Sequence, residues 1–241
     1  MMALMGMALL MGVMMSACLS SNNDDNKTTQ NVIALYENGV LEQYGGGTLV
    51  PTNSNYLPSA PGIYTFSIEY DPTTWNDNKL NVTITSVPIS LTNSNVLAGE
   101  KSGNVNLYDL EYSGEMFPSM FNQDYILIPC IFWMENVNAD AYEKEQGKHR
   151  FSLVAPSDLH DSEGILHLTL VDEVTDPEVE RTKSSWLYQA FNIKDVIAGF
   201  KAANGEINTI RIWGSTNRTS YDPEDGRTTK KYVDVDLTPF Q

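Results

Sequence analysis

Short segments that alternate between apolar and polar residues, separated by turn residues, constrain the fold of this chain more than any other feature. In the stretch GIYTFSIEY, residues 62–70, every second residue from Tyr64 onward is aromatic or apolar. Side chains of a strand point alternately to its two faces, so this pattern predicts a strand with one buried face. The dipeptide Asn38-Gly39 stands between two apolar runs and is a strong hairpin signal. The sequence therefore predicts a mostly β fold.

Two groups of such segments stand on either side of a polar stretch. Residues 92–106, TNSNVLAGEKSGNVN, are rich in Asn, Gly and Ser, which is typical of a connection between domains. We expect a small N-terminal β-barrel over residues 32–97 and an antiparallel β-sandwich over residues 105–241. Apolar residues at helical spacing predict one helix within residues 184–203, with Asn192 or Ser184 as its N-terminal cap.

The N-terminal residues predict export. Residues 1–17 carry no charge, are shorter than the roughly 20 residues of a membrane span, and end in the small residues Ser16 and Ala17, which is typical of a signal peptide. Ser16-Ala17-Cys18 resembles a bacterial lipobox. In that resemblance a signal peptidase cuts after Ala17 and a diacylglycerol is attached to the sulfur of Cys18. The polar residues 18–31 are expected to form a flexible tether.

The whole layout resembles the NigD-like lipoproteins of the Bacteroidetes. The resemblance lies in the lipobox, the polar tether, the small β domain and the later stretches YILIPCIFW, HRFSLVA and GILHLTLVDEV. It implies an OB-type N-terminal barrel followed by a β-sandwich, with a membrane contact made through the lipid anchor. The acidic pair Asp24-Asp25 resembles the signal that sends such lipoproteins to the outer face of the outer membrane. We therefore expect an outer-membrane lipoprotein at the cell surface, with the periplasmic face as the alternative.

Charge and cysteine content exclude several kinds of partner and crosslink. The net charge of -16 repels phosphate groups, so no nucleic-acid partner is expected. Cys130 is the only cysteine besides Cys18. With Cys18 acylated it has no disulfide partner, and its apolar neighbours predict a buried thiol.

No metal or cofactor is expected from the sequence. The three histidines His149, His160 and His167 lack the ligand spacing of a zinc site, and the stretch around His160 is typical of a turn. The stretch YDPEDGR, residues 221–227, offers carboxylates to calcium, but its Asp-Pro and Asp-Gly pairs favour a turn.

Aromatic residues supply the candidate binding site. Trp75, in the turn YDPTTWNDN, is expected to be exposed and is the candidate ligand-binding aromatic, whereas Trp133 and Trp213 lie in strands and are expected in the core. No catalytic motif is present. The first hypothesis is a non-catalytic binding or accessory protein with a protein or glycan partner. The alternative is a glycan-handling hydrolase or an accessory protein of polysaccharide capture, since carboxylates are plentiful.

Overall fold

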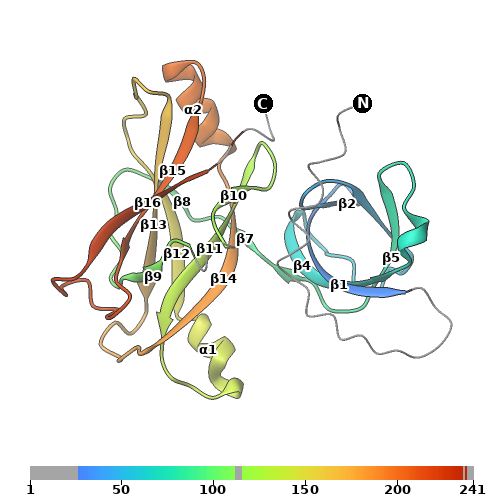
Figure 1. Cartoon of the computed structure of the whole chain (residues 1–241), viewed down its shortest axis with the longest axis horizontal. Coiled ribbons are helices and arrows are strands. Elements are labelled where there is room, and N and C mark those ends of the chain that lie inside the picture. The colour runs from blue at the N-terminus through green and yellow to red at the C-terminus, as the bar shows by residue number, and fades with distance from the viewer. Residues whose placement is uncertain (1–26, 112–115, 236, 238–241) are drawn as a thin grey trace. The chain divides into compact units, whose positions relative to one another are not determined.

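The computed structural model of this chain describes residues 27–111, 116–235 and 237 (Figure 1). The predicted signal peptide, the cleavage residue Ala17 and the lipid-attachment residue Cys18 lie outside the described residues. Contacts divide the chain into two compact units, residues 1–92 and residues 93–241. Among the described residues, no helix is both long enough and apolar enough to cross a membrane.

The first unit is a closed five-stranded barrel. Its strands follow the order β1-β2-β3-β5-β4, and β1 also pairs with β4, which closes the barrel. All of these pairings are antiparallel except β3 with β5. The strands are β1 (Thr28–Glu37), β2 (Val40–Gln43), β3 (Thr48–Pro51), β4 (Gly62–Tyr70) and β5 (Lys79–Ile84), with the short β6 (Ile89–Ser90) beside β4. The predicted small N-terminal barrel is confirmed.

Alternating residues build the core of this barrel, as expected. Phe66 and Ile68 of β4 are buried together with Leu41, Leu49 and other apolar residues of the neighbouring strands. Asn38 and Gly39 have φ angles of 52° and 80°, the left-handed values that a two-residue hairpin turn requires. Strand β1 begins at Thr28, so residues 28–31 of the predicted tether pair with the end of β4. Their polar side chains do not prevent this pairing, because the hydrogen bonds between strands are made by backbone N–H and C=O groups.

The second unit is one ten-stranded, nearly closed sheet. Its main path is β7-β14-β11-β9-β15-β13-β12-β8, while β10 pairs with β11 and β16 with β15. The strands are β7 (Thr92–Asn93), β8 (Val96–Ala98), β9 (Leu107–Asp109), β10 (Ser119–Met120), β11 (Tyr125–Met134), β12 (His149–Ala155), β13 (Ile165–Val174), β14 (Lys183–Asn192), β15 (Thr209–Thr216) and β16 (Thr229–Val235). The mostly β fold class is confirmed. In detail, β13 with β15, β8 with β12 and β9 with β15 are parallel pairs, which the antiparallel pattern did not predict.

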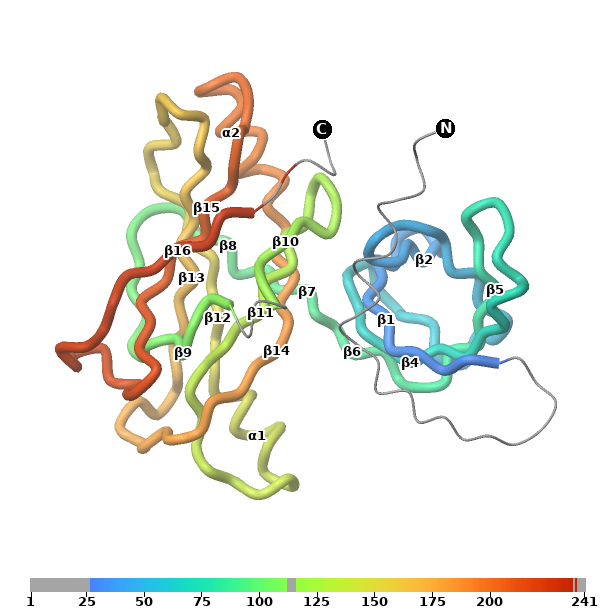
Figure 2. Tube along the Cα trace, in the orientation of Figure 1, coloured from blue at the N-terminus to red at the C-terminus, as the bar shows by residue number. Residues whose placement is uncertain are grey.

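Two short helices accompany this sheet and lie at opposite ends of it in Figure 1 and Figure 2. They are α1 (Tyr142–Gln146) and α2 (Lys194–Asn204), and single 3-10 turns lie at Pro72–Thr74 and Ala139–Ala141. Helix α2 covers only the second half of the predicted helix, residues 184–203. Of the two predicted starts, Ser184 is wrong, because residues 183–192 pair with β11 along its length and form β14. The helix begins just after Asn192, whose side chain accepts a hydrogen bond from the N–H of Lys194 over 3.1 Å.

The core of the second unit lies on the inner face of the sheet. Cys130 is completely buried there, as predicted, beside Phe132 and among apolar residues of other strands. Trp133 is also buried, and its indole N–H donates to the carbonyl oxygen of Asn217 over 2.8 Å. The prediction that Trp213 lies in the core is wrong. Ile210 and Ile212 occupy the inward positions of β15, so Trp213 points outward.

Candidate functional site

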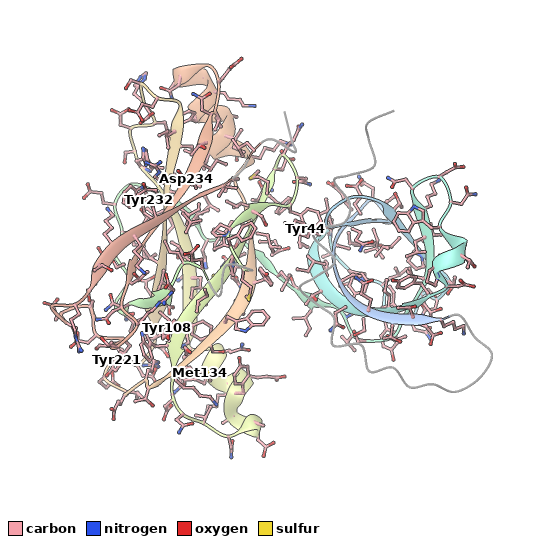
Figure 3. All side chains as sticks on the ribbon, viewed as in Figure 1. Tyr44, Tyr108, Met134, Tyr221, Tyr232 and Asp234 are labelled. Carbon is pink, nitrogen blue, oxygen red and sulfur yellow. The ribbon has the colours of Figure 1, made fainter. Side chains whose placement is uncertain are left out.

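Strand register places a set of aromatic and charged side chains on the outer side of β13, β15 and β16. Pairing of β13 with β15 sets His167 beside Arg211 and Thr169 beside Trp213. Pairing of β15 with β16 sets Arg211 beside Asp234 and Trp213 beside Tyr232. The first row across the three strands is therefore His167, Arg211 and Asp234, and the second row is Thr169, Trp213 and Tyr232. We call this surface the β15 face, and Figure 3 labels its members Tyr232 and Asp234. Its residues are His167, Thr169, Arg211, Trp213, Lys230, Tyr232 and Asp234.

The first row holds a bidentate ion pair. Arg211 donates from Nε to Oδ1 of Asp234 over 2.6 Å and from Nη2 to Oδ2 over 2.8 Å. The same guanidinium lies 4.1 Å from the centroid of the Tyr232 ring, a cation–π contact. Hydrogen bonds from Arg211 lower the pKa of Asp234 below its ordinary value. The planar groups are thus held in one orientation with the carboxylate ionised.

The second row is aromatic and is tied to the first by His167. The rings of Trp213 and Tyr232 lie 4.8 Å apart between centroids. Trp213 donates from its indole nitrogen to Nδ1 of His167 over 3.0 Å, so the network assigns the proton of the neutral imidazole to Nε2. That Nε2 lies 3.5 Å from a carboxylate oxygen of Asp161. The indole plane is therefore fixed from two sides, while Tyr232 remains 50% exposed.

The β15 face brings together groups that suit the binding of a ligand. It presents two aromatic rings, a guanidinium with unused donors, a carboxylate and, 5.4 Å from the Trp213 ring centroid, the ammonium of Lys230. Within residues 27–111 and 116–235, no three His, Cys, Asp or Glu side chains are arranged to hold a metal ion.

Trp75, the aromatic residue selected from the sequence, lies in the first unit. It follows the 3-10 turn that Asp71 caps by accepting a hydrogen bond from the N–H of Thr73, and 40% of Trp75 is exposed. Its ring lies on Gly47, where an added Cβ atom would approach the ring to 2.9 Å. Trp75 is thus exposed as expected, and it is separate from the aromatic pair of the β15 face.

The stretch around His160 and the stretch YDPEDGR form turns, as predicted. Asp158 accepts a hydrogen bond from the N–H of His160, and Asp161 accepts from the N–H groups of Glu163 and Ile165. In YDPEDGR, Asp222 accepts from the N–H of Glu224 and Asp225 from that of Arg227. The short acidic side chains bind their own backbone, as in other Asx turns.

A buried ionic cluster, which the sequence did not predict, lies where α1 meets β12 and the segment before β14. The fully buried Arg181 donates from Nε to Glu145 over 3.1 Å and from Nη2 to Asp176 over 2.5 Å. Lys148 lies 2.7 Å from the second Glu145 oxygen and 2.9 Å from Asp176. Nδ1 of the neighbouring His149 lies 2.8 Å from Asp172, and both of these side chains are completely buried. Because every cation has a carboxylate partner, we interpret this cluster as structural.

The β15 face could be found in the sequence only by following alternation in two stretches at once. In INTIRIWGST the isoleucines alternate with Arg211 and Trp213, and in KYVDVDL the valines alternate with Tyr232 and Asp234. Each stretch separately shows an amphipathic strand. The two outward faces are adjacent because β15 pairs with β16, and the alternation within each stretch does not show which strands pair.

No protein-family model matches the chain, and no curated protein matches its sequence. Solved structures do share its fold. A putative lipoprotein from Bacteroides fragilis NCTC 9343 is 20% identical, with a TM-score of 0.74 over 87% of this chain and 97% of its own. An uncharacterized protein from Parabacteroides merdae ATCC 43184 is 12% identical, with a TM-score of 0.53 over 86% and 96%.

A NigD-like immunity protein from Bacteroides caccae ATCC 43185 is 15% identical, with a TM-score of 0.49 over 87% of this chain and 94% of its own. The similarities to the Bacteroides fragilis and Parabacteroides merdae structures are similarities of fold. The resemblance to lipoproteins of the Bacteroidetes that the sequence predicted is therefore confirmed for the fold, which this chain shares with the Bacteroides fragilis structure.

Proposed function

We propose that this chain is a lipid-anchored protein of the bacterial outer membrane that binds a partner at the cell surface without catalysis. The observation that carries the binding role is the β15 face, where Trp213, Tyr232 and the Arg211–Asp234 pair are ordered by one another. Tyr232 and Asp234 are exposed, whereas Trp213 and Arg211 are half-buried. The lipobox at Cys18 supports the anchor. The fold shared with a putative lipoprotein agrees with it.

The carboxylates of the face do not favour the alternative, a glycan-handling hydrolase. A glycosidase needs one carboxylic acid that is protonated near neutral pH. Hydrogen bonds from Arg211 lower the pKa of Asp234, and hydrogen bonds from the backbone of Ile165 and Glu163 lower that of Asp161. Both groups are ionised carboxylates at neutral pH, so they can accept hydrogen bonds from a ligand.

Replacement of the anchoring cysteine tests the location. We expect Cys18→Ser to move the protein from the membrane fraction to the soluble fraction, because the sulfur that carries the diacylglycerol is lost and multi-chain acyl anchors hold proteins firmly. Cys130→Ser serves as the matched control and stays with the membrane. The measurement is immunoblotting after cell fractionation. A Cys18→Ser variant that remains in the detergent-extracted membrane fraction would overturn the lipoprotein assignment.

Replacement of Trp213 tests the binding role. The wild-type protein, purified in mild detergent and immobilised, is expected to retain an envelope component that Trp213→Ala no longer retains. Trp186→Ala is the control, because Trp186 is another exposed tryptophan of the same unit, 45% accessible, on β14. Equal retention by wild type and Trp213→Ala would contradict binding through the β15 face.

A further inference from the structure

We infer that the β15 face binds a carbohydrate chain, with one sugar ring stacked on Trp213 and hydroxyl groups bonded by Arg211 and Asp234. This inference rests on the proposed binding function and names the ligand class. The evidence is the juxtaposition of an ordered aromatic surface with planar hydrogen-bonding groups in the next row of the same sheet.

The aromatic row supplies the stacking surface. A sugar ring has an apolar side formed by its C–H groups, and such a side packs on the electron-rich face of an indole. Trp213 is held by its hydrogen bond to His167 and by the neighbouring ring of Tyr232. A ring that is already ordered loses little conformational entropy when a ligand is placed on it, which favours binding.

The ionic row supplies the hydrogen bonds. A guanidinium has five N–H donors, and Arg211 directs only one from Nε and one from Nη2 at Asp234. The remaining donors, and the second lone pairs of the carboxylate oxygens, are available to a ligand. Neighbouring hydroxyl groups of a sugar are both donors and acceptors, so one can donate to Asp234 while the next accepts from Arg211. The ammonium of Lys230 adds another donor group near the indole ring. Because Lys230 is exposed, its side chain can move aside when a ligand binds.

The composition of the face argues against a protein or a nucleic acid in the same place. The centre of a protein interface is apolar, whereas the side chains between the aromatic rings and the strand ends include the hydroxylated Thr169, Thr209 and Ser215, with Ile165 beside Thr209. Asp161 and Asp234, together with the chain's net charge of -16, repel the phosphates of a nucleic acid.

Affinity electrophoresis tests the inference. The purified wild-type protein is run through native gels that contain a soluble β-glucan, an α-mannan, a xylan or polygalacturonate at increasing concentration. We expect retardation by at least one of these polymers, and neutral and acidic polymers are compared directly. We expect Trp213→Ala and Tyr232→Ala to weaken the retardation at least 10-fold, about the loss of 1.4 kcal/mol of binding free energy. Trp186→Ala is the matched aromatic control and retains it.

A second variant separates loss of binding from loss of folding. Arg211→Lys keeps the positive charge but removes the bidentate geometry, so it is expected to weaken retardation while the thermal unfolding curve stays that of the wild type. In protein labelled with ¹⁵N-tryptophan, the indole N–H signal of Trp213 is identified by its absence from the spectrum of Trp213→Phe. Oligomers of the polysaccharide that retards the wild type are then added. We expect them to shift the Trp213 signal and to leave the Trp186 signal in place.

The outcomes separate this inference from the proposed function. If no polymer retards the wild type, or if Trp213→Ala is retarded equally, the β15 face does not bind carbohydrate and the inference is wrong. If the immobilised protein then still retains a Trp213-dependent envelope component that the polymers do not displace, the proposed binding function stands with a different ligand. If retention does not depend on Trp213, the proposed function fails as well.

Discussion

Cys130 illustrates how burial decides the chemistry of a single residue. Its thiol is completely buried beside Phe132, and burial, followed by the nearby charge of Asp172, raises its pKa well above the ordinary value. A thiol that is neither ionised nor accessible does not react. The residue therefore acts as a small apolar group in the core of the second unit.

We expect a thiol reagent to label no cysteine in the native wild-type protein and one cysteine after unfolding in guanidinium. The single reactive thiol is then Cys130, because the proposed acylation would block the sulfur of Cys18. The measurement is the absorbance released by an aromatic disulfide reagent. Labelling of Cys130 in the native state would contradict its burial, and two thiols after unfolding would show that Cys18 carries no lipid.

The buried ionic cluster makes stability depend on acid. Burial acts to raise the pKa of Glu145, but hydrogen bonds from Lys148 and from the N–H of Glu135, with the charge of Arg181, outweigh it and lower the pKa. The pKa of Asp176 is lowered in the same way, against burial, by Lys148 and Arg181. Carboxyl groups with lowered folded-state pKa values stabilise the protein above their ordinary values, and this contribution is lost as the pH falls through the folded-state values.

We therefore expect the melting temperature to fall steeply as the pH drops below about 4.5, the ordinary pKa of Glu145. Glu145→Gln is expected to lower stability at neutral pH by about 1.5–3 kcal/mol, because it removes one of the two carboxylates that pair with the buried Arg181, while Asp176 remains. It should also flatten the acid response. Asp172 acts in the opposite direction, since burial raises its pKa. An unchanged acid response in Glu145→Gln, measured by differential scanning calorimetry, would exclude this cluster as the cause.

Strand β13 is held in place by a close backbone contact with the segment before β9. A Cβ atom added to Gly103 would lie 2.3 Å from the carbonyl oxygen of Asp172, and Val105 forms an isolated bridge with the same residue. Only a glycine allows the two backbones to approach so closely. Asp172 in turn holds His149, so this contact fixes the end of the strand that carries His167 at its other end.

We expect Gly103→Ala to destabilise the second unit by about 1–3 kcal/mol, the usual cost of forcing an extra methyl group into a packed site. Gly226→Ala is the matched control, because nothing lies within 4 Å of a Cβ atom at that position. Denaturant unfolding, followed by tryptophan fluorescence, measures both. Equal midpoints for the two variants would contradict the packing described for Gly103.

At the scale of the whole molecule, two cores stabilise the chain. The apolar cluster of the barrel and that of the ten-stranded sheet share no residue. Three of the four tryptophans, Trp133, Trp186 and Trp213, lie in the second unit. The stability of each core can therefore be followed by signals from its own unit.

We expect Leu41→Ala, which empties a completely buried position of the barrel, to destabilise the first unit by about 2–5 kcal/mol. Hydrogen exchange of β1 and β4 should increase, while the exchange of β11 and β13 stays that of the wild type. The measurement is exchange mass spectrometry at neutral pH. Leu153→Ala, in the core of the second unit, is the reciprocal control. Equal acceleration in both units would contradict separate cores.

Much of this fold is predictable because alternation is local. The barrel, the buried Cys130 and the turns around His160 and Asp222 follow from residues that are near one another in sequence. The start of helix α2 was left open between Ser184 and Asn192, because the pairing with β11 that makes residues 183–192 a strand comes from a distant segment. The β15 face was missed for the same reason, since it depends on the register between three separate strands.

The parallel pairing of β13 with β15 has a thermodynamic consequence. His167, Arg211 and Asp234 are brought into one row only after β14 and α2 have crossed between the two strands. In the unfolded chain the row does not exist, so a ligand of the β15 face binds the native state alone. Such a ligand raises the free energy of unfolding by mass action, by about 2.7 kcal/mol at a concentration 100 times its Kd. The melting temperature of the second unit would then report how much of the ligand is present.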